Sequence, residues 1–263
     1  MKKTRRKIRI WFQGATDRVH MAPYIRKVEA HLKKILDPGS SYVFNTTSPP
    51  ATTTHALTEF RIAGAFVRGA LEAERRGFDA MAITHFQDAG LAEVKSVAGI
   101  PVLGLGETTL LHACTLGRKL GLVTINPAFI PWHEDQVIRY GLQQRVIGVR
   151  AVSASVADFI DAFASKDAFD RLYPKWEREC KALLQAGADV IVPAGGLPMM
   201  LYGSKPGANL DGAPIVNGIT LIAKTAKMAV KLRRLAAMAA VSRRSNYAKP
   251  PEKSLREFLD GGQ

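Results

Sequence analysis

The chain has 263 residues, of which 47% are hydrophobic and 23% are charged, so it contains enough apolar sequence for a packed core. No apolar run approaches the roughly 20 residues that cross a bilayer, and we therefore expect no membrane insertion. The formal net charge of +14 would suit a nucleic-acid partner, but no basic stripe interleaved with aromatic residues accompanies it, so we expect no specific nucleic-acid binding.

The first half of the chain alternates short apolar runs with amphipathic stretches. After the basic residues 1–9, the run IRIWF is too short for a signal peptide and predicts a first strand. Helices are expected at His20–Leu36 and Leu57–Arg76, each followed by a glycine-containing stop. Strands are expected at Ile8–Phe12, Ser41–Phe44, Ala80–Thr84 and Pro101–Leu105.

The second half continues the same alternation, and together the two halves predict an α/β fold with mostly parallel sheets flanked by helices. Strands are expected at Gly121–Ile125, Val146–Val152, Asp189–Val192 and Ala213–Val216. Helices are expected at Glu107–Gly117, His133–Tyr140, Ser155–Ala164, Phe169–Ala186 and Asn217–Val241.

One short pattern occurs twice, 110 residues apart. Residues 74–85 (ERRGFDAMAITH) and 184–195 (LQAGADVIVPAG) each contain a helix end, a glycine, an aspartate two residues later and a buried strand. The repetition predicts two pseudo-symmetric lobes, with the active site at the strand ends in the cleft between them. His85 and Gly195 stand at equivalent points of the two lobes.

The first lobe is expected to contain residues 1–105 and a returning helix within 218–241, and the second lobe residues 106–217. Residues 242–263 are expected to form a mobile basic tail. Residues 1–9 carry six basic and no acidic residues, and residues 224–263 carry ten basic and three acidic residues. The positive charge therefore belongs to the chain ends, which indicates a solvated surface.

The two cysteines, Cys114 and Cys180, fall inside helical patterns and lack metal-ligand spacing. We expect both to be inert thiols of a reduced, cytoplasmic protein. The histidines show no metal-ligand spacing either, and no dinucleotide or phosphate-loop motif is complete, so the sequence predicts no metal and no cofactor.

Two stretches resemble the aspartate/glutamate/hydantoin racemase superfamily, and the resemblance extends in order and spacing over roughly residues 5–235. EAERRGFDAMAITHFQDAGLAEVKSVAGIPVLGLGETTLLHA is similar to the segment around that family's first catalytic cysteine, and GADVIVPAGGLPMM to the segment around the second. The resemblance implies a cofactor-independent enzyme. The family's racemases use two thiols, one on each face of a carbon acid, and its decarboxylases keep one.

The sequence departs from the family at both catalytic positions. His85 stands where the first cysteine is expected, and Gly195 where the second is expected. The turn after the first strand is also altered, to Phe12-Gln13-Gly14-Ala15-Thr16. Cys114 and Cys180 match neither thiol position.

The predicted catalytic residues are His85 and Glu107. A neutral imidazole at a strand end can take or give a proton, and Glu107 could orient it or act as a second acid or base. The alternatives are a structural histidine and a carboxylate that only favours a helix N-terminus. Asp88 is predicted to cap the helix after His85, and His133 to be a solvent-facing cap.

Substrate binding is predicted at the strand ends of both lobes. As the resemblance implies, the backbone amides of Gly195 and Gly196 would hold a carboxylate or a developing enolate. Hydroxyls and an amide at the first sheet's edge would anchor substrate oxygens. The predicted substrate-binding residues are Gln13, Thr46, Thr47, Thr84, Gly195 and Gly196.

Stereo-inversion needs a proton donor on one face of the carbon and an acceptor on the other, but this chain offers one base facing a glycine. The sequence therefore predicts a one-base lyase or hydrolase that uses His85 on a small carboxylate or cyclic amide. The alternatives are a hydantoin racemase-like isomerase, a non-catalytic small-molecule binding protein on the same scaffold, and a polyanion- or membrane-surface-binding protein. We expect a small-molecule substrate and a homo-oligomer.

Overall fold

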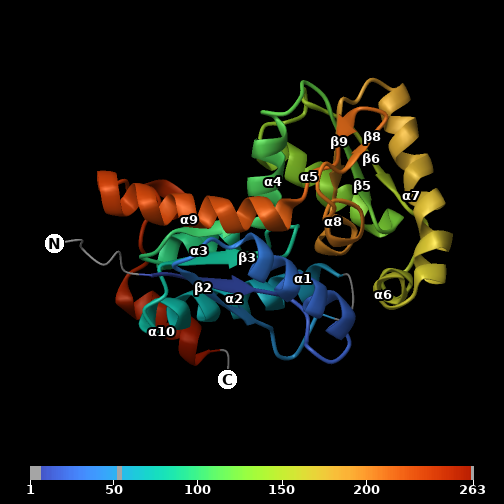
Figure 1. Cartoon of the computed structure of the whole chain (residues 1–263). Helices are drawn as coiled ribbons and strands as arrows, with labels where there is room; N and C mark the ends of the chain where they lie inside the picture. Colours follow the sequence, from blue (N-terminus) through green and yellow to red (C-terminus); the bar gives the residue numbers. More distant parts are fainter. Residues whose placement is uncertain (1–6, 52–54, 262–263) are drawn as a thin grey trace.

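The computed structural model describes residues 7–51 and 55–261, which form two lobes (Figure 1). The basic residues at positions 2–6 lie outside the described residues. In the first lobe a parallel sheet has the strand order β2-β1-β3-β4. Its strands are β1 (Ile8–Gln13), β2 (Ser40–Asn45), β3 (Ala80–Ile83) and β4 (Val102–Gly104). Parallel strands bring their carboxyl ends to one edge of the sheet.

Helices cover both faces of this sheet. They are α1 (Ala22–Ile35), α2 (Ala56–Arg75), α3 (Leu91–Val97) and α9 (Gly218–Ala236). On one face, Ile62 and Phe66 of α2 pack in a cluster with Trp11 and Met81. The alternate strand residues, such as Ile10, belong to the core shared with α1 and α9. Figure 1 shows α9 lying along the first lobe, although it follows the second lobe in sequence.

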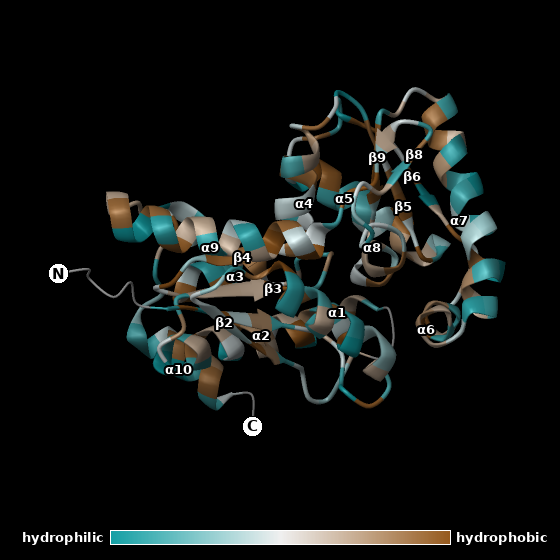
Figure 2. Cartoon of the chain, in the orientation of Figure 1, coloured by the Kyte–Doolittle hydropathy of each residue, from teal (hydrophilic) through white to brown (hydrophobic). Residues whose placement is uncertain are grey.

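The second lobe holds a parallel sheet of order β6-β5-β7, built from β5 (Leu120–Thr124), β6 (Val146–Ala151) and β7 (Val190–Pro193). A hairpin of β8 (Asn209–Leu210) and β9 (Ala213–Pro214) lies beside it. The helices are α4 (Leu105–Ala113), η1 (Pro127–Phe129), α5 (Ile130–Arg139), α6 (Val156–Ala164), α7 (Lys166–Gln185) and α8 (Gly196–Tyr202). Figure 2 shows α7 and α9 alternating between polar and apolar residues, as expected for helices that cover a sheet on one side.

The repeated sequence pattern has the same structural role in each lobe. Gly77 and Gly187 end α2 and α7 with φ values of 71° and 98°, which suit glycine. Asp79 then accepts a hydrogen bond from the backbone N–H of Arg9 at the start of β1, at 2.9 Å. Asp189 accepts one from the N–H of Lys119, just before β5, at 2.8 Å. The predicted fold of two α/β lobes with parallel sheets is confirmed.

The C-terminal segment packs on the first lobe, so the expectation of a mobile tail is wrong for its described part. It contains η2 (Ser245–Tyr247) and α10 (Glu252–Asp260). Arg68 of α2 donates to the carbonyl of Leu259 at 3.0 Å, and its guanidinium lies over the Phe258 ring. Arg243 donates to the Ser96 carbonyl at the end of α3. Among the described helices, none is long and apolar enough to cross a membrane.

Candidate functional site

A cavity of about 350 Å³ lies where the strand ends of the two lobes meet. The first lobe contributes the loop after β1, the start of α2 and the segment after β3. The second lobe contributes the ends of β5 and β7. The polar and glycine residues of the lining include Thr16, Asp17, His20, Glu59, Thr84, His85, Gln87, Thr124, Gly195 and Gly196. His85 and Gly195 therefore line one cavity from different lobes, as the internal repeat predicts.

His85 is paired with a carboxylate inside this cavity. Its Nε2 lies 3.0 Å and 2.8 Å from the two carboxylate oxygens of Glu59, in the first turn of α2. The His85 ring also meets the Phe66 ring edge-on, at 6.2 Å between centroids. Because a carboxylate accepts hydrogen bonds, the neutral ring carries its proton on Nε2, and Nδ1 is then the basic nitrogen. The pair has the form of a histidine oriented by an acid.

Glu107 is not part of this pair, so its predicted position beside His85 is wrong. Its carboxylate binds Nζ of Lys95 at 2.7 Å, and it does not line the cavity. Glu107 lies in the first turn of α4 and Lys95 lies on α3, so their ion pair joins these two helices. Its predicted catalytic role has no structural support.

Asp88 is a helix cap, as predicted, but for α4 rather than for the helix directly after His85. Its buried carboxylate accepts hydrogen bonds from the backbone N–H groups of Gly106 (3.0 Å) and Glu107 (2.6 Å) and from the Tyr140 hydroxyl (2.6 Å). Burial raises the pKa of Asp88 to about 6, while these hydrogen bonds act in the opposite direction. Asp88 thus ties the segment after β3 to helices of the second lobe.

His133 is buried, so its predicted place as a solvent-facing cap is wrong. Its side chain lies between Thr124 Oγ1, 3.2 Å from Nε2, and Gln136 Oε1, 3.3 Å from Nδ1. Its ring also contacts Phe86 and Phe129. Burial lowers the pKa of His133 to about 4, which keeps the ring neutral at physiological pH. His133 therefore supports the cavity wall from behind Thr124.

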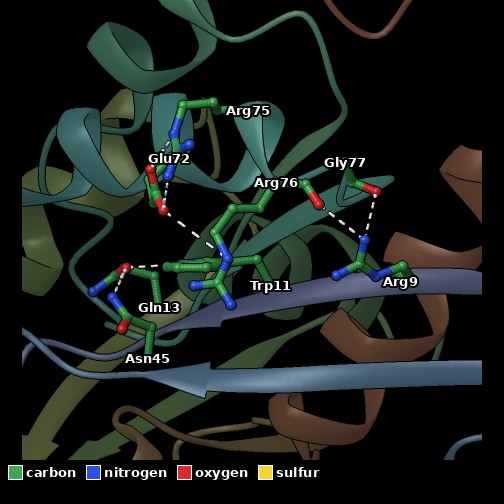
Figure 3. A network of polar contacts seen from close by, with 8 residues as sticks. All are labelled: Arg9, Trp11, Gln13, Asn45, Glu72, Arg75, Arg76 and Gly77. Atoms are coloured by element: carbon green, nitrogen blue, oxygen red, sulfur yellow. Dashed lines mark hydrogen bonds and ion pairs between the residues drawn. The ribbon is translucent and has the colours of Figure 1, made fainter.

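Gln13 and Thr47 brace the loop after β1 and do not line the cavity. Figure 3 shows Gln13 between Trp11 and Asn45, whose side chains donate to its Oε1, each at 2.9 Å. Nε2 of Gln13 donates to the Gly14 carbonyl at 3.2 Å, and the Thr47 hydroxyl donates to the same carbonyl at 2.8 Å. Thr46 is absent from the described lining as well. The structure does not bring these three predicted substrate-binding residues into the cavity.

The other predicted substrate-binding residues, Thr84, Gly195 and Gly196, do line the cavity. Gly195 has φ 146° and ψ 151°, a region that is almost restricted to glycine. A side chain at Gly196 would place Cβ 2.2 Å from the Tyr24 hydroxyl. Neither cysteine lines the cavity, and burial raises the pKa of the Cys180 thiol. The wall opposite His85 is therefore built around glycine backbone.

Sequence reasoning missed most of the polar residues of the lining, among them Glu59, His20 and Thr124. Glu59 lies 26 positions before His85, and no local motif connects them. His20 binds the Asp17 carboxylate at 2.8 Å in the loop after β1, and its backbone N–H lowers the pKa of Asp17. Thr124 could have been found as the polar residue that ends an apolar strand in the second lobe. Among the described residues, no group of three or more histidine, cysteine, aspartate or glutamate side chains could hold a metal ion.

Known proteins with similar sequences and known proteins with similar structures agree on one protein family. The sequence profile of the Asp/Glu/Hydantoin racemase family matches residues 22–226. A hydantoin racemase of Rhizobium meliloti is 28% identical over 207 residues, which is 78% of this chain and 80% of the relative.

Two solved structures share the fold over nearly the whole chain. The allantoin racemase from Klebsiella pneumoniae has a TM-score of 0.78 at 20% identity, covering 94% of this chain and 95% of that one. The allantoin racemase from Pseudomonas fluorescens has a TM-score of 0.77 at 22% identity, covering 93% and 98%. Since the family profile spans most of the sequence, the chain belongs to the Asp/Glu/Hydantoin racemase family.

Proposed function

We propose that this protein is an isomerase that moves a proton at a carbon next to a carbonyl in a small cyclic amide, with His85 as the proton-transfer group. The observation that carries the proposal is the His85–Glu59 pair in a cavity between the two lobes. The names of the relatives favour an isomerase over the lyase or hydrolase expected from the sequence.

The chemistry follows from the pair. The C–H bond next to the carbonyl breaks, its proton passes to Nδ1 of His85, and the electron pair moves onto the carbonyl oxygen to give an enolate. Glu59 accepts the hydrogen bond from Nε2 and stabilises the imidazolium that forms. Return of a proton to the opposite face of the carbon inverts its configuration.

The return proton needs a source on the other side of the ring. Gly195 offers no side chain on the wall of the second lobe, and the described lining holds a second histidine, His20 of the first lobe, which is bound to Asp17. The side chain of His20 is 76% exposed, so it is in contact with solvent water. In this proposal His20, or water beside it, delivers the second proton.

A second candidate is a one-base lyase, such as a decarboxylase. The observation in its favour is that the described lining from the second lobe, which includes Gly195, contains no acidic side chain. In that reaction the carbon–carboxylate bond breaks, CO₂ leaves and its bonding electron pair stays on the substrate as an enolate, and His85, which has first taken a proton from water on Nδ1, protonates that enolate on one face only.

Reaction in D₂O separates these functions. With one enantiomer of a 5-substituted hydantoin or of allantoin, the isomerase exchanges the carbon-bound hydrogen for deuterium, seen by NMR, and abolishes optical rotation. His85→Ala should lower this rate by roughly 10²–10⁴-fold. Cys114→Ser is the matched control and should retain the wild-type rate, because Cys114 does not line the cavity.

Other outcomes have definite meanings. Release of CO₂ from a malonate-type substrate, without exchange of hydantoin, favours the lyase. Ligand binding without exchange or bond cleavage in any carbon acid favours a binding protein on the same scaffold. Undiminished exchange by His85→Ala would remove His85 from the mechanism.

A further inference from the structure

Two threonines, Thr84 and Thr124, line the cavity from opposite lobes. Each donates its hydroxyl proton to a group of the cavity wall. Thr84 follows β3, and its Oγ1 donates to the Gln13 carbonyl at 3.1 Å. The backbone N–H of Thr84 donates to the same carbonyl at 2.8 Å, which fixes the residue against β1. With its proton used in this way, the Thr84 oxygen can only accept a hydrogen bond from a ligand in the cavity.

The direction in which the second threonine, Thr124, donates its hydroxyl proton is set by a buried series of hydrogen bonds that begins at Gln136. Nε2 of Gln136 donates to the Phe86 carbonyl at 2.6 Å and to the Asp88 carboxylate at 3.1 Å. A carbonyl oxygen can only accept, so the nitrogen of the Gln136 amide must lie on this side. The amide oxygen therefore lies toward His133.

The orientation of Gln136 determines which nitrogen of His133 carries the proton. The amide oxygen, 3.3 Å from Nδ1, requires a proton there, and the buried ring is neutral, so Nε2 keeps its lone pair. That lone pair accepts the proton of Thr124 Oγ1, at 3.2 Å. The one other wall partner of this hydroxyl among the described residues, the Ala194 carbonyl at 3.2 Å, is also an acceptor. Either way the Thr124 proton points into the wall.

We infer that Thr84 and Thr124 are specificity-determining acceptors that select a ligand with N–H groups on two sides. The inference rests on the proposed function in taking a cyclic amide as the ligand. His133 and Gln136 are positioning residues that hold Thr124 in its acceptor state. Both threonine oxygens are thereby set before any ligand arrives.

The chemistry of the ligand follows from this arrangement. A hydantoin ring carries two N–H groups next to its carbonyls and can donate to both threonines. A carboxylate presents lone pairs, which would face the lone pairs of Thr84 and Thr124 without a shared proton. The pair therefore favours a neutral ring with N–H donors over an amino-acid carboxylate.

The test measures the binding of hydantoin, 1-methylhydantoin and 3-methylhydantoin by titration calorimetry. Thr84→Val and Thr124→Val should each weaken hydantoin binding by about tenfold or more, because valine leaves a ligand N–H unpaired. Each variant should leave the affinity for one N-methyl compound unchanged, a different compound for each threonine. Thr124→Ser keeps the hydroxyl and should bind like the wild type.

Thr109→Val is the matched control, because Thr109 also donates to a backbone carbonyl, that of Leu105, but lies outside the cavity lining. It should leave all three affinities unchanged. Equal weakening of hydantoin and both N-methyl compounds by the valine variants, or none, would overturn the inference. So would failure of hydantoin to bind the wild-type protein at millimolar concentration. Threonine-dependent N–H discrimination without deuterium exchange would support the inference and contradict only the proposed function.

Discussion

The carboxylate of Glu59 holds His85 through both of its oxygens, so its charge and its geometry can be tested separately. Glu59→Gln keeps an oxygen that can accept from Nε2 but removes the charge that stabilises an imidazolium. We expect turnover to fall about 10²-fold in kcat with little change in thermal stability. Steady-state kinetics and a thermal melt measure the two effects.

Glu107→Gln is the natural control for this substitution, since it changes a carboxylate paired with Lys95 outside the cavity. It should keep near-normal kcat. If Glu107→Gln impairs turnover more than Glu59→Gln does, the assignment of the orienting acid is reversed.

Gly195 should resist substitution because of its backbone conformation. Its φ of 146° is strained for any side chain, and a Cβ would also lie 3.3 Å from Cδ of Pro198. Gly195→Ala should lower the free energy of unfolding by about 1–3 kcal/mol, measured by chemical denaturation. Gly148→Ala, where a Cβ meets nothing closer than 3.7 Å, should change it by less than about 0.5 kcal/mol. If both substitutions change the free energy of unfolding equally, the backbone conformation at residue 195 does not require glycine.

At the scale of elements, α5 makes the stability of the protein depend on pH through His133. Burial holds the folded-state pKa of His133 at about 4, below its ordinary value of 6.5. The unfolded chain therefore binds the proton more readily, and the stability that neutral His133 permits is lost as the pH falls from about 6.5 to about 4. This loss amounts to roughly 3 kcal/mol.

Asp88 acts with the opposite sign over nearly the same range. Its folded-state pKa of about 6 lies above its ordinary value, so acidification through pH 6 favours the folded protein. The two effects offset each other in the wild type. In His133→Asn only the Asp88 effect remains, and the free energy of unfolding should rise relative to wild type between pH 6.5 and pH 4. If the difference in the free energy of unfolding between His133→Asn and wild type stays constant from pH 6.5 to pH 4, the pH dependence assigned to His133 is contradicted.

The sequence predicts the long elements well, because glycine stops and apolar runs mark their ends. It gives no bounds for α3 and α8, which have seven residues each, too few for a helical period to emerge. His85 could be placed at the site from its strand end, the internal repeat and the family resemblance together. Glu59 could not, since its contact with His85 depends on how α2 packs, and Glu107 was misplaced because its partner Lys95 lies on a separate helix.

At the scale of the whole molecule, the C-terminal segment belongs to the first lobe. Deleting residues 243–263 removes the contacts of Phe258 and Leu255 with α2 and its neighbours. We expect a loss of about 2 kcal/mol, or a fall of roughly 4–8 °C in Tm, in a calorimetric scan. Turnover should be retained, because no described residue of this segment lines the cavity.

A shorter deletion separates the parts of this segment. Removing residues 248–263 keeps Arg243 and its bond to the Ser96 carbonyl. It should lower Tm by less than the full deletion does. An unchanged Tm in both truncated chains would show that α10 does not stay on α2 in solution.

The backbone at Gly195 also has an evolutionary consequence. A single change from glycine to cysteine would place a thiol on a φ of 146°, so destabilisation would come before any gain from a second acid. His85 would meanwhile remain on the other wall, so the new thiol would face an imidazole and not a second thiol. Two thiols facing each other across this cavity would require substitutions at both positions together with a new backbone conformation at residue 195, and single substitutions accepted one at a time would not reach that arrangement.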